Sequence, residues 1–222
     1  MKYFILLALL STPFGFSTPD CKNFPALTPL ECGCDRMKGP ASYNLAFITT
    51  QGTFTVSVNR ADAPIGADRL YSMAFCGYLG ADSVPGNDNG FFRVVPGFVV
   101  QWGIGGNTTV SQAWENLIIP NDVTKRLSNV RGTLSYAAEQ DSEGKACNRT
   151  TQIYINFADN SRLDSLGFTP VGTISEADMS VVDKISSKWG QTPDQDQIYA
   201  QGNAYLLKNF PGLDYVKATK LL

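Results

Sequence analysis

The chemically reactive side chains of this 222-residue protein include 18 basic and 20 acidic residues and five cysteines, but no histidine. Without imidazole, Ser-His-Asp and Cys-His catalytic systems and zinc sites of the HExxH type are excluded. Any reaction that the chain catalyses must therefore proceed without a histidine base or proton shuttle. The net charge of −2 also gives no basic surface of the kind that binds nucleic acids, so no nucleic-acid partner is expected.

The five cysteines, Cys21, Cys32, Cys34, Cys76 and Cys147, favour structural bridges over a metal site. The pair in Cys32-Gly33-Cys34 is not followed by a second pair of ligands at zinc-finger spacing, and no histidine can complete such a site. In an oxidising compartment disulfides are the default, so we expect at most two bridges and one unpaired thiol. Neither a metal nor a cofactor is expected.

A glycine-rich run, Gly103-Ile104-Gly105-Gly106, invites comparison with a phosphate-binding loop. No Lys-Ser/Thr pair follows the glycines, and no helix start is visible after them. We therefore expect no phosphate site at this run and no helix directly after it.

The N-terminus has the pattern of a secretory signal peptide. Lys2 precedes an apolar run over residues 3–10, and small residues lead to a predicted cleavage after Ser17. A membrane anchor is the alternative, but the run is too short to span a bilayer and Pro13 soon breaks it. We expect a secreted protein, or one in the lumen of the secretory pathway, with no membrane attachment after cleavage.

Two N-glycosylation sequons fit the same compartment. They begin at Asn107 and Asn148, where the sequence reads Asn-Thr-Thr and Asn-Arg-Thr. Such sequons predict glycans on surface loops when the host glycosylates its secreted proteins.

The elements that would position a site begin with a β-hairpin and a helix. Residues 43–50 and 53–58 form the two predicted strands, and the second alternates strictly between polar and apolar residues. Pro64 then opens a helix that Gly77 ends. Its apolar face is predicted to carry Ala67, Leu70, Met73 and Ala74.

Strand signals return after residue 90 and continue to a second helix. Predicted strands cover residues 91–95, 98–102, 132–138, 151–157 and 169–174. Ser175, with Asp178 three residues later, caps a helix whose apolar positions are Met179, Val182 and Ile185. Many short strands with two helices predict a mainly β fold, a closed antiparallel barrel capped by the helices.

We divide the chain into four parts. They are a signal peptide over residues 1–17, a cysteine-bearing extension over 18–40, a barrel over 41–190 and a C-terminal extension over 191–222. In the last part, an apolar pattern predicts a short amphipathic helix, and residues 210–213 predict a return turn. The apolar positions are Ile198, Tyr199, Tyr205, Leu206 and Leu207. We expect this extension to pack on the barrel; a partner-binding arm is the alternative.

The segment over residues 91–103 resembles the cyclophilin signature F-H-R-V-I-P-G-F-M-x-Q-G-G, and reads FFRVVPGFVVQWG. Residues 132–137, 152–155, 163–164 and 168–172 resemble later segments of the family, in the same order. The resemblance covers about residues 43–188. It implies a closed barrel of eight antiparallel strands with two α-helices, and peptidyl-prolyl cis-trans isomerase activity without a cofactor.

The same resemblance implies the site residues. Arg93 would donate to the prolyl nitrogen, and Gln101 would bind the substrate backbone and orient Arg93. Phe98, Val99, Tyr154, Leu163 and Phe168 would form the proline pocket, supported by Phe91. Ala137 and Ala138 would offer an open backbone edge to the substrate.

The chain departs from the family pattern near this site. Phe92, Val99 and Trp102 replace the usual His, Met and Gly, and Trp102 is expected to add bulk beside Gln101. The pocket Trp and His of the family align with Arg162 and Phe168. Arg162 would attract carbonyl groups or acidic residues of the substrate. Alternatively, as a second cation near Arg93, it would weaken the site. The loop over residues 139–151 is longer than usual, with Glu139 as an acidic gatekeeper.

We therefore expect a monomeric isomerase that acts on X-Pro bonds of polypeptides in the secretory pathway or outside the cell. Its partners would be proline-containing polypeptides. The alternative is a protein that keeps the barrel but binds such partners without catalysis. With arginine as the catalytic charge and no histidine, the rate should be nearly flat from about pH 5.5 to 8.5.

Overall fold

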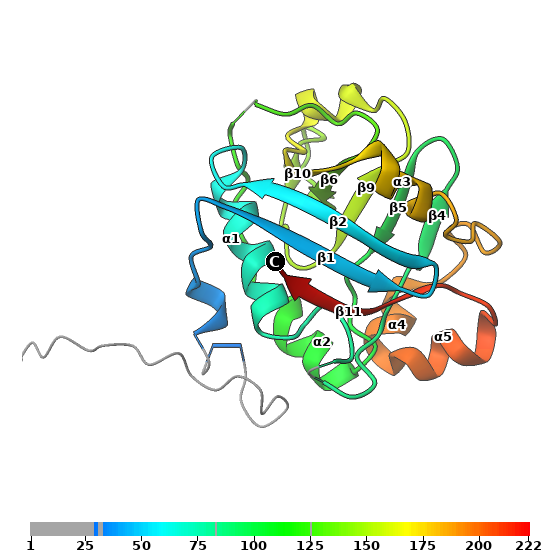
Figure 1. The fold of residues 1–222 in the computed structure, drawn as a ribbon. Coiled ribbons are helices and arrows are strands. Elements are labelled where there is room, and N and C mark those ends of the chain that lie inside the picture. The colour runs from blue at the N-terminus through cyan, green and yellow to red at the C-terminus, as the bar shows by residue number, and fades with distance from the viewer. Residues whose placement is uncertain (1–28, 31–32, 83, 125) are drawn as a thin grey trace, which may run out of the picture.

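A computed structural model describes residues 29–30, 33–82, 84–124 and 126–222. The predicted signal peptide, Cys21 and Cys32 lie outside these residues. The described part is mainly β, with one curled antiparallel sheet and short helices around it (Figure 1). None of its helices has the length and apolar character needed to cross a membrane.

The main sheet has nine strands in the order β3-β11-β1-β2-β10-β6-β9-β5-β4. In chain order they are β1 (Ser42–Thr49), β2 (Gly52–Asn59), β3 (Asn89–Gly90), β4 (Arg93–Val95), β5 (Val99–Trp102), β6 (Thr133–Tyr136), β9 (Ile153–Asn156), β10 (Pro170–Ile174) and β11 (Tyr215–Leu221). Only Phe91 and Phe92 separate the edge strands β3 and β4, which holds the sheet edges within about 11 Å. The predicted barrel-like β fold is confirmed, with nine strands where eight were expected.

The hairpin over β1 and β2 forms as predicted. Tyr43 pairs with Val58 and Thr49 with Gly52, so the register runs through to the turn. Phe54, Val56 and Val58 are buried, while the residues between them face outward to different degrees. The alternation in the sequence therefore reports the core face of β2.

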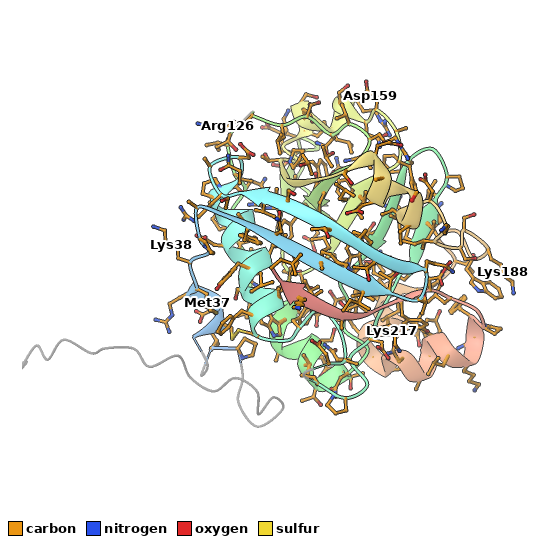
Figure 2. The ribbon with its side chains drawn as sticks, viewed as in Figure 1. Met37, Lys38, Arg126, Asp159, Lys188 and Lys217 are labelled. Atoms are coloured by element: carbon orange, nitrogen blue, oxygen red, sulfur yellow. A yellow bond between two sulfur atoms is a disulfide. The ribbon has the colours of Figure 1, made fainter. Side chains whose placement is uncertain are left out.

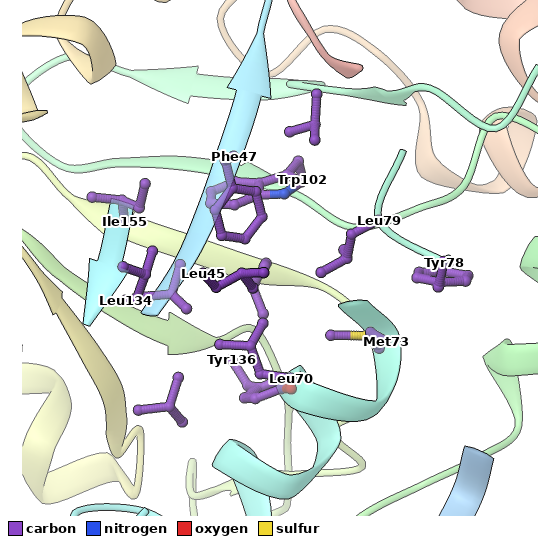
Figure 3. Packing of buried hydrophobic residues seen from close by; sticks show 14 of the residues in the cluster. Leu45, Phe47, Leu70, Met73, Tyr78, Leu79, Trp102, Leu134, Tyr136 and Ile155 are labelled. Carbon is purple, nitrogen blue, oxygen red and sulfur yellow. The ribbon is translucent and has the colours of Figure 1, made fainter. Parts of the chain in front are cut away.

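The barrel interior is an aromatic and aliphatic core (Figure 3). The rings of Phe47 and Trp102 meet edge to face with centroids 5.6 Å apart. Leu70 and Met73 reach this core from α1 (Pro64–Phe75), which has Pro64 at its start and Gly77 just beyond its end, as predicted. Charged side chains such as Lys38 and Asp159 lie outside, as Figure 2 shows.

The prediction that no helix follows the glycine run was wrong. Helix α2 (Thr108–Glu115) begins directly after it, because the Asn107 Oδ1 accepts the backbone N–H groups of Thr109 and Val110 at 3.1 and 3.4 Å. An asparagine cap is a known start signal. Asn107 therefore begins a helix rather than lying in the expected loop.

The second predicted helix is α3 (Glu176–Val182). The Ser175 hydroxyl accepts the Asp178 N–H at 3.1 Å, as the capping pattern predicted. Met179 and Val182 are buried, and Ile185 is buried just after the helix ends. This helix packs on β2.

The C-terminal part differs from its prediction. It forms two helices, α4 (Gln195–Gln201) and α5 (Asn203–Asn209), where one was expected. Strand β11 then enters the sheet between β3 and β1, so the end of the chain supplies a wall of the barrel rather than only packing on it. Leu207, expected on the apolar face, is exposed. The two helices, with Phe92, form a second hydrophobic cluster.

A disulfide joins Cys34 to Cys76 across 42 residues of sequence. It ties a 3-10 turn, η2 (Cys34–Arg36), to the end of α1. Cys147 has a free thiol. It lies in a small hairpin of β7 (Glu139–Gln140) and β8 (Ala146–Cys147), which occupies the longer loop.

Candidate active site

One cavity of about 650 Å³ brings the predicted site residues together. It is lined by all of them except Phe91: Arg93, Phe98, Val99, Gln101, Ala137, Ala138, Tyr154, Leu163 and Phe168. Asn148 and Glu139 also lie on it, whereas Asn107 does not. Residues from separate motifs along the chain thus meet at one place in the fold.

Strand β5 explains how neighbouring residues are divided between core and cavity. Its side chains alternate, so Val100 and Trp102 face the barrel core while Val99 and Gln101 line the cavity. The expectation that Trp102 adds bulk beside Gln101 was therefore wrong. Phe91 is likewise fully buried and packs on Trp102 with ring centroids 5.2 Å apart.

Arg93 and Gln101 form a cross-strand pair between β4 and β5. The Arg93 Nη1 donates to the Gln101 Oε1 at 3.1 Å. Arg93 is half-buried and forms no ion pair with any residue that the structure describes. The guanidinium is thus held by a neutral amide and keeps donors to spare.

Arg162 lies outside the cavity, although it aligns with a pocket residue of the family. Its guanidinium sits 4.9 Å from the centre of the Phe98 ring, while that of Arg93 lies 5.7 Å from the same centre. Arg162 donates to the Asn160 Oδ1 at 2.8 Å and is exposed. Phe98 therefore contacts two cations, of which only Arg93 lines the cavity.

One side of the cavity, which we call the apolar wall, is formed by hydrophobic side chains. They are Phe98, Val99, Tyr154, Leu163, Leu166 and Phe168. The Tyr154 and Phe168 rings lie edge to face with centroids 6.4 Å apart. Leu163 and Leu166 come from the 3-10 helix η3 (Ser161–Leu166). Such a wall can hold a small apolar ring by excluding water from it.

Asn129 fixes the apolar wall from behind, and the sequence analysis missed it. Its Oδ1 accepts hydrogen bonds from Tyr154 at 2.9 Å, Ser135 at 2.8 Å and Asn156 at 3.2 Å. Its Nδ2 donates to Asp164 at 2.7 Å and to the Phe168 carbonyl at 2.6 Å. No periodicity marks this loop residue, so its role depends on contacts far apart in sequence.

Tyr154 stands where the family generally has Phe, and its hydroxyl needs a partner. Asn129 supplies that partner, which removes the cost of burying an unpaired hydroxyl. Burial raises the pKa of Tyr154 well above the usual tyrosine range. The residue therefore stays neutral and serves as an apolar ring with a fixed donor.

A second set of lining residues, which we call the polar wall, consists of Arg93, Gln101, Gln152 and Tyr199. The Gln101 Nε2 donates to the Gln152 Oε1 at 2.8 Å, and the Gln152 Nε2 donates to the Tyr199 hydroxyl at 3.4 Å. Gln152 could have been found from the alternation of β9, because it lies two residues before Tyr154. Tyr199 was noticed only as part of an apolar pattern.

The rim of the cavity carries the edge backbone and the longer loop. Ala137 already donates its N–H to the Gln152 carbonyl at 3.0 Å, so that group is not open to a ligand. Glu139 is exposed, and its Oε2 accepts the Asn148 Nδ2 at 2.7 Å. Asn148 has a left-handed backbone with φ of 53°. Within the described ranges, no group of three or more thiol or carboxylate side chains could hold a metal ion.

The family model described as "Cyclophilin type peptidyl-prolyl cis-trans isomerase/CLD" matches residues 45–202. The chain belongs to this family. A curated relative, peptidyl-prolyl cis-trans isomerase A of Dickeya dadantii (strain 3937), is 30% identical over 149 residues, covering 65% of this chain and 72% of the relative. A peptidyl-prolyl cis-trans isomerase of Acinetobacter baylyi is 29% identical over 143 residues, covering 63% and 69%.

Solved cyclophilins share the fold of this chain. A cyclophilin-type isomerase of Cryptosporidium parvum aligns with a TM-score of 0.57 at 14% identity, covering 82% of this chain and 98% of that one. A second structure of that protein, in the presence of the dipeptide Ala-Pro, gives a TM-score of 0.56 at 15% identity, with 81% and 98% covered. At this identity the likeness establishes the cyclophilin fold.

Proposed function

We propose that this cyclophilin isomerises X-Pro bonds of polypeptides in the secretory pathway or outside the cell, with Arg93 as the catalytic donor. The observation that carries the proposal is the placement of Arg93. Its guanidinium lines an open cavity and is oriented by a hydrogen bond to Gln101. It forms an ion pair with no carboxylate among the described residues. Proline-containing polypeptides would be the substrates.

The chemistry needs a donor rather than a nucleophile. Rotation about an X-Pro amide meets a barrier of about 18–20 kcal/mol, because planarity delocalises the nitrogen lone pair into the carbonyl. At the twisted transition state the nitrogen regains this lone pair and can accept a hydrogen bond. A fixed arginine that donates there stabilises the transition state more than the planar ground state.

The apolar wall supplies the second requirement, which is to hold the proline ring while the preceding carbonyl turns. Phe98, Leu163 and Phe168 would contact the ring, and Gln101 would bind the substrate backbone. The carbonyl of Ala137 and the backbone of Ala138 would pair with the residue before proline, since the Ala137 N–H is occupied. Glu139 would select residues next to the proline.

Substitution of Arg93 tests this function. In Arg93→Ala, loss of one charge-assisted hydrogen bond should lower kcat/KM by about one to two decades, measured by NMR exchange on a short X-Pro peptide. Arg162→Ala is the matched control, because Arg162 contacts the same Phe98 ring from outside the cavity and should leave the rate within about twofold. Peptide binding by the unaltered protein without faster exchange would favour the non-catalytic binding alternative, whereas equal acceleration by Arg93→Ala would exclude Arg93 as the donor.

The location in the secretory pathway rests on the N-terminal signal pattern and the two sequons, and the Cys34–Cys76 disulfide supports it. Expression of the full chain in a eukaryotic secretory host tests it. We expect exported protein whose N-terminus is Thr18 and whose mass includes glycans at Asn107 and Asn148. Retention of the unprocessed chain in the cytosol would contradict the location.

A further inference from the structure

Helix α4 of the C-terminal part lies on the cavity, next to the residues that hold Arg93. Gln195, Asp196 and Tyr199 line the cavity, while Ile198 is fully buried in the second hydrophobic cluster. The helix therefore has one face in a hydrophobic cluster and another on the proposed active site. In the chain it lies between the barrel strands β10 and β11, and it is part of the same cavity.

Two glycines allow α4 to approach the barrel closely. A Cβ on Gly202, at the end of α4, would lie 2.1 Å from the Gly106 carbonyl oxygen, and a Cβ on Gly106 would lie 2.0 Å from the Asn203 Nδ2. The Gly106 carbonyl also accepts the Asn203 N–H at 2.9 Å. The glycine-rich run after β5 thus serves as a docking place for the tail, and it fixes α4 relative to the strand that carries Gln101.

The hydrogen bonds of the polar wall run in one direction, from Arg93 to Tyr199. Each glutamine uses its amide oxygen toward Arg93 and its amide nitrogen toward α4. A glutamine amide can turn by 180° and exchange these two groups unless its partners differ in type. The Arg93 guanidinium therefore fixes the orientation of both amides, because a reversed Gln101 would present N–H groups to it.

The Tyr199 hydroxyl ends the series and is itself held in place. It accepts the Gln152 Nε2 at 3.4 Å, which is the longest link of the three. The Tyr199 carbonyl accepts the Gln112 Nε2 from α2 at 3.4 Å, and the side chain is half-buried. A tyrosine hydroxyl can accept or donate, so the direction of the series is set at its other end, where Arg93 only donates. The Tyr199 hydroxyl completes the series by accepting the Gln152 Nε2, and so restrains the Gln152 amide.

We propose that Tyr199 is a positioning residue of the active site, which anchors the Gln152 amide and, through it, the Gln101 amide that holds Arg93. This inference rests on the proposed function. It makes α4, which lies between β10 and β11 in the chain, a part of the catalytic unit.

The test compares two tyrosine substitutions in the full chain. Tyr199→Phe should lower kcat about threefold with KM unchanged, since it weakens the aim of the catalytic donor rather than substrate binding. Tyr205→Phe is the control: its hydroxyl accepts the Asp194 N–H at 3.2 Å in the same tail but does not line the cavity. Unchanged kcat in Tyr199→Phe, or an equal loss in both variants, would overturn the proposal.

A second measurement reads the position of Arg93 without using activity. NMR relaxation of the Arg93 side-chain Nε–Hε should show a lower order parameter in Tyr199→Phe and no change in Tyr205→Phe. An unaltered order parameter in Tyr199→Phe also overturns the proposal. A protein without isomerase activity would contradict the proposed function while leaving this measurement interpretable, so the two failures are distinguishable.

Discussion

The two walls of the cavity are held in different ways. Behind the apolar wall, buried Asn129 takes part in side-chain hydrogen bonds of 2.6–3.2 Å that join two strands, η3 and the Phe168 carbonyl. The polar wall is a single series of three hydrogen bonds that ends with a 3.4 Å link to a helix of the tail. The comparison teaches that the proposed surface for the proline ring is held within the barrel, whereas the orientation of Arg93 is linked to a helix that lies outside the sheet.

The largest expected effect comes from removing the support of the apolar wall. Asn129→Ala removes the acceptor that the buried hydroxyls of Tyr154 and Ser135 share, and should lower the free energy of unfolding by about 3 kcal/mol. Urea denaturation measures this loss.

Asn209→Ala is the matched control for that substitution. Asn209 is exposed and donates one hydrogen bond, to the Tyr205 carbonyl at 2.8 Å, so its loss should cost less than about 0.5 kcal/mol. If Asn129→Ala cost as little as Asn209→Ala, the two walls would not differ in the stiffness of their support.

The smallest expected effect is that of pH on the rate, and it tests the residues of the polar wall. The chain has no histidine, arginine keeps its charge, and burial raises the pKa of Tyr199 above the usual tyrosine value. We therefore expect kcat/KM to vary less than about twofold between about pH 5.5 and 8.5. A bell-shaped profile in peptide exchange assays would contradict the assignment of Arg93.

Stability, unlike the rate, should depend on pH in alkaline solution. Burial raises the pKa of Tyr78, Tyr136 and Tyr154, so the folded state favours their neutral forms. Their stabilisation is fully present below the unfolded tyrosine pKa of about 10 and is lost as the pH rises above it. Urea unfolding at increasing alkaline pH is the measurement.

Short-range patterns in the sequence predicted much of the fold. The alternation in β2 and the proline start and glycine end of α1 depend on neighbours within a few residues, and these elements formed as expected. The asparagine cap of α2 was an equally local signal that the interpretation overlooked. Strand β11 was not predicted, because its pairing with β1 joins residues far apart in the chain.

The sequence alone determined the chemistry that is available to this protein: a chain without histidine, with an arginine and a glutamine at the spacing of one family motif, placed on adjacent strands. Only the tertiary structure decided what surrounds that pair. Asn129 and Tyr199 lie 36 and 106 residues after Arg93, and neither carries a periodic signal that points to the cavity. Hydrogen bonds between such distant residues form only after the hydrophobic burial of the barrel and the tail has brought their backbones together.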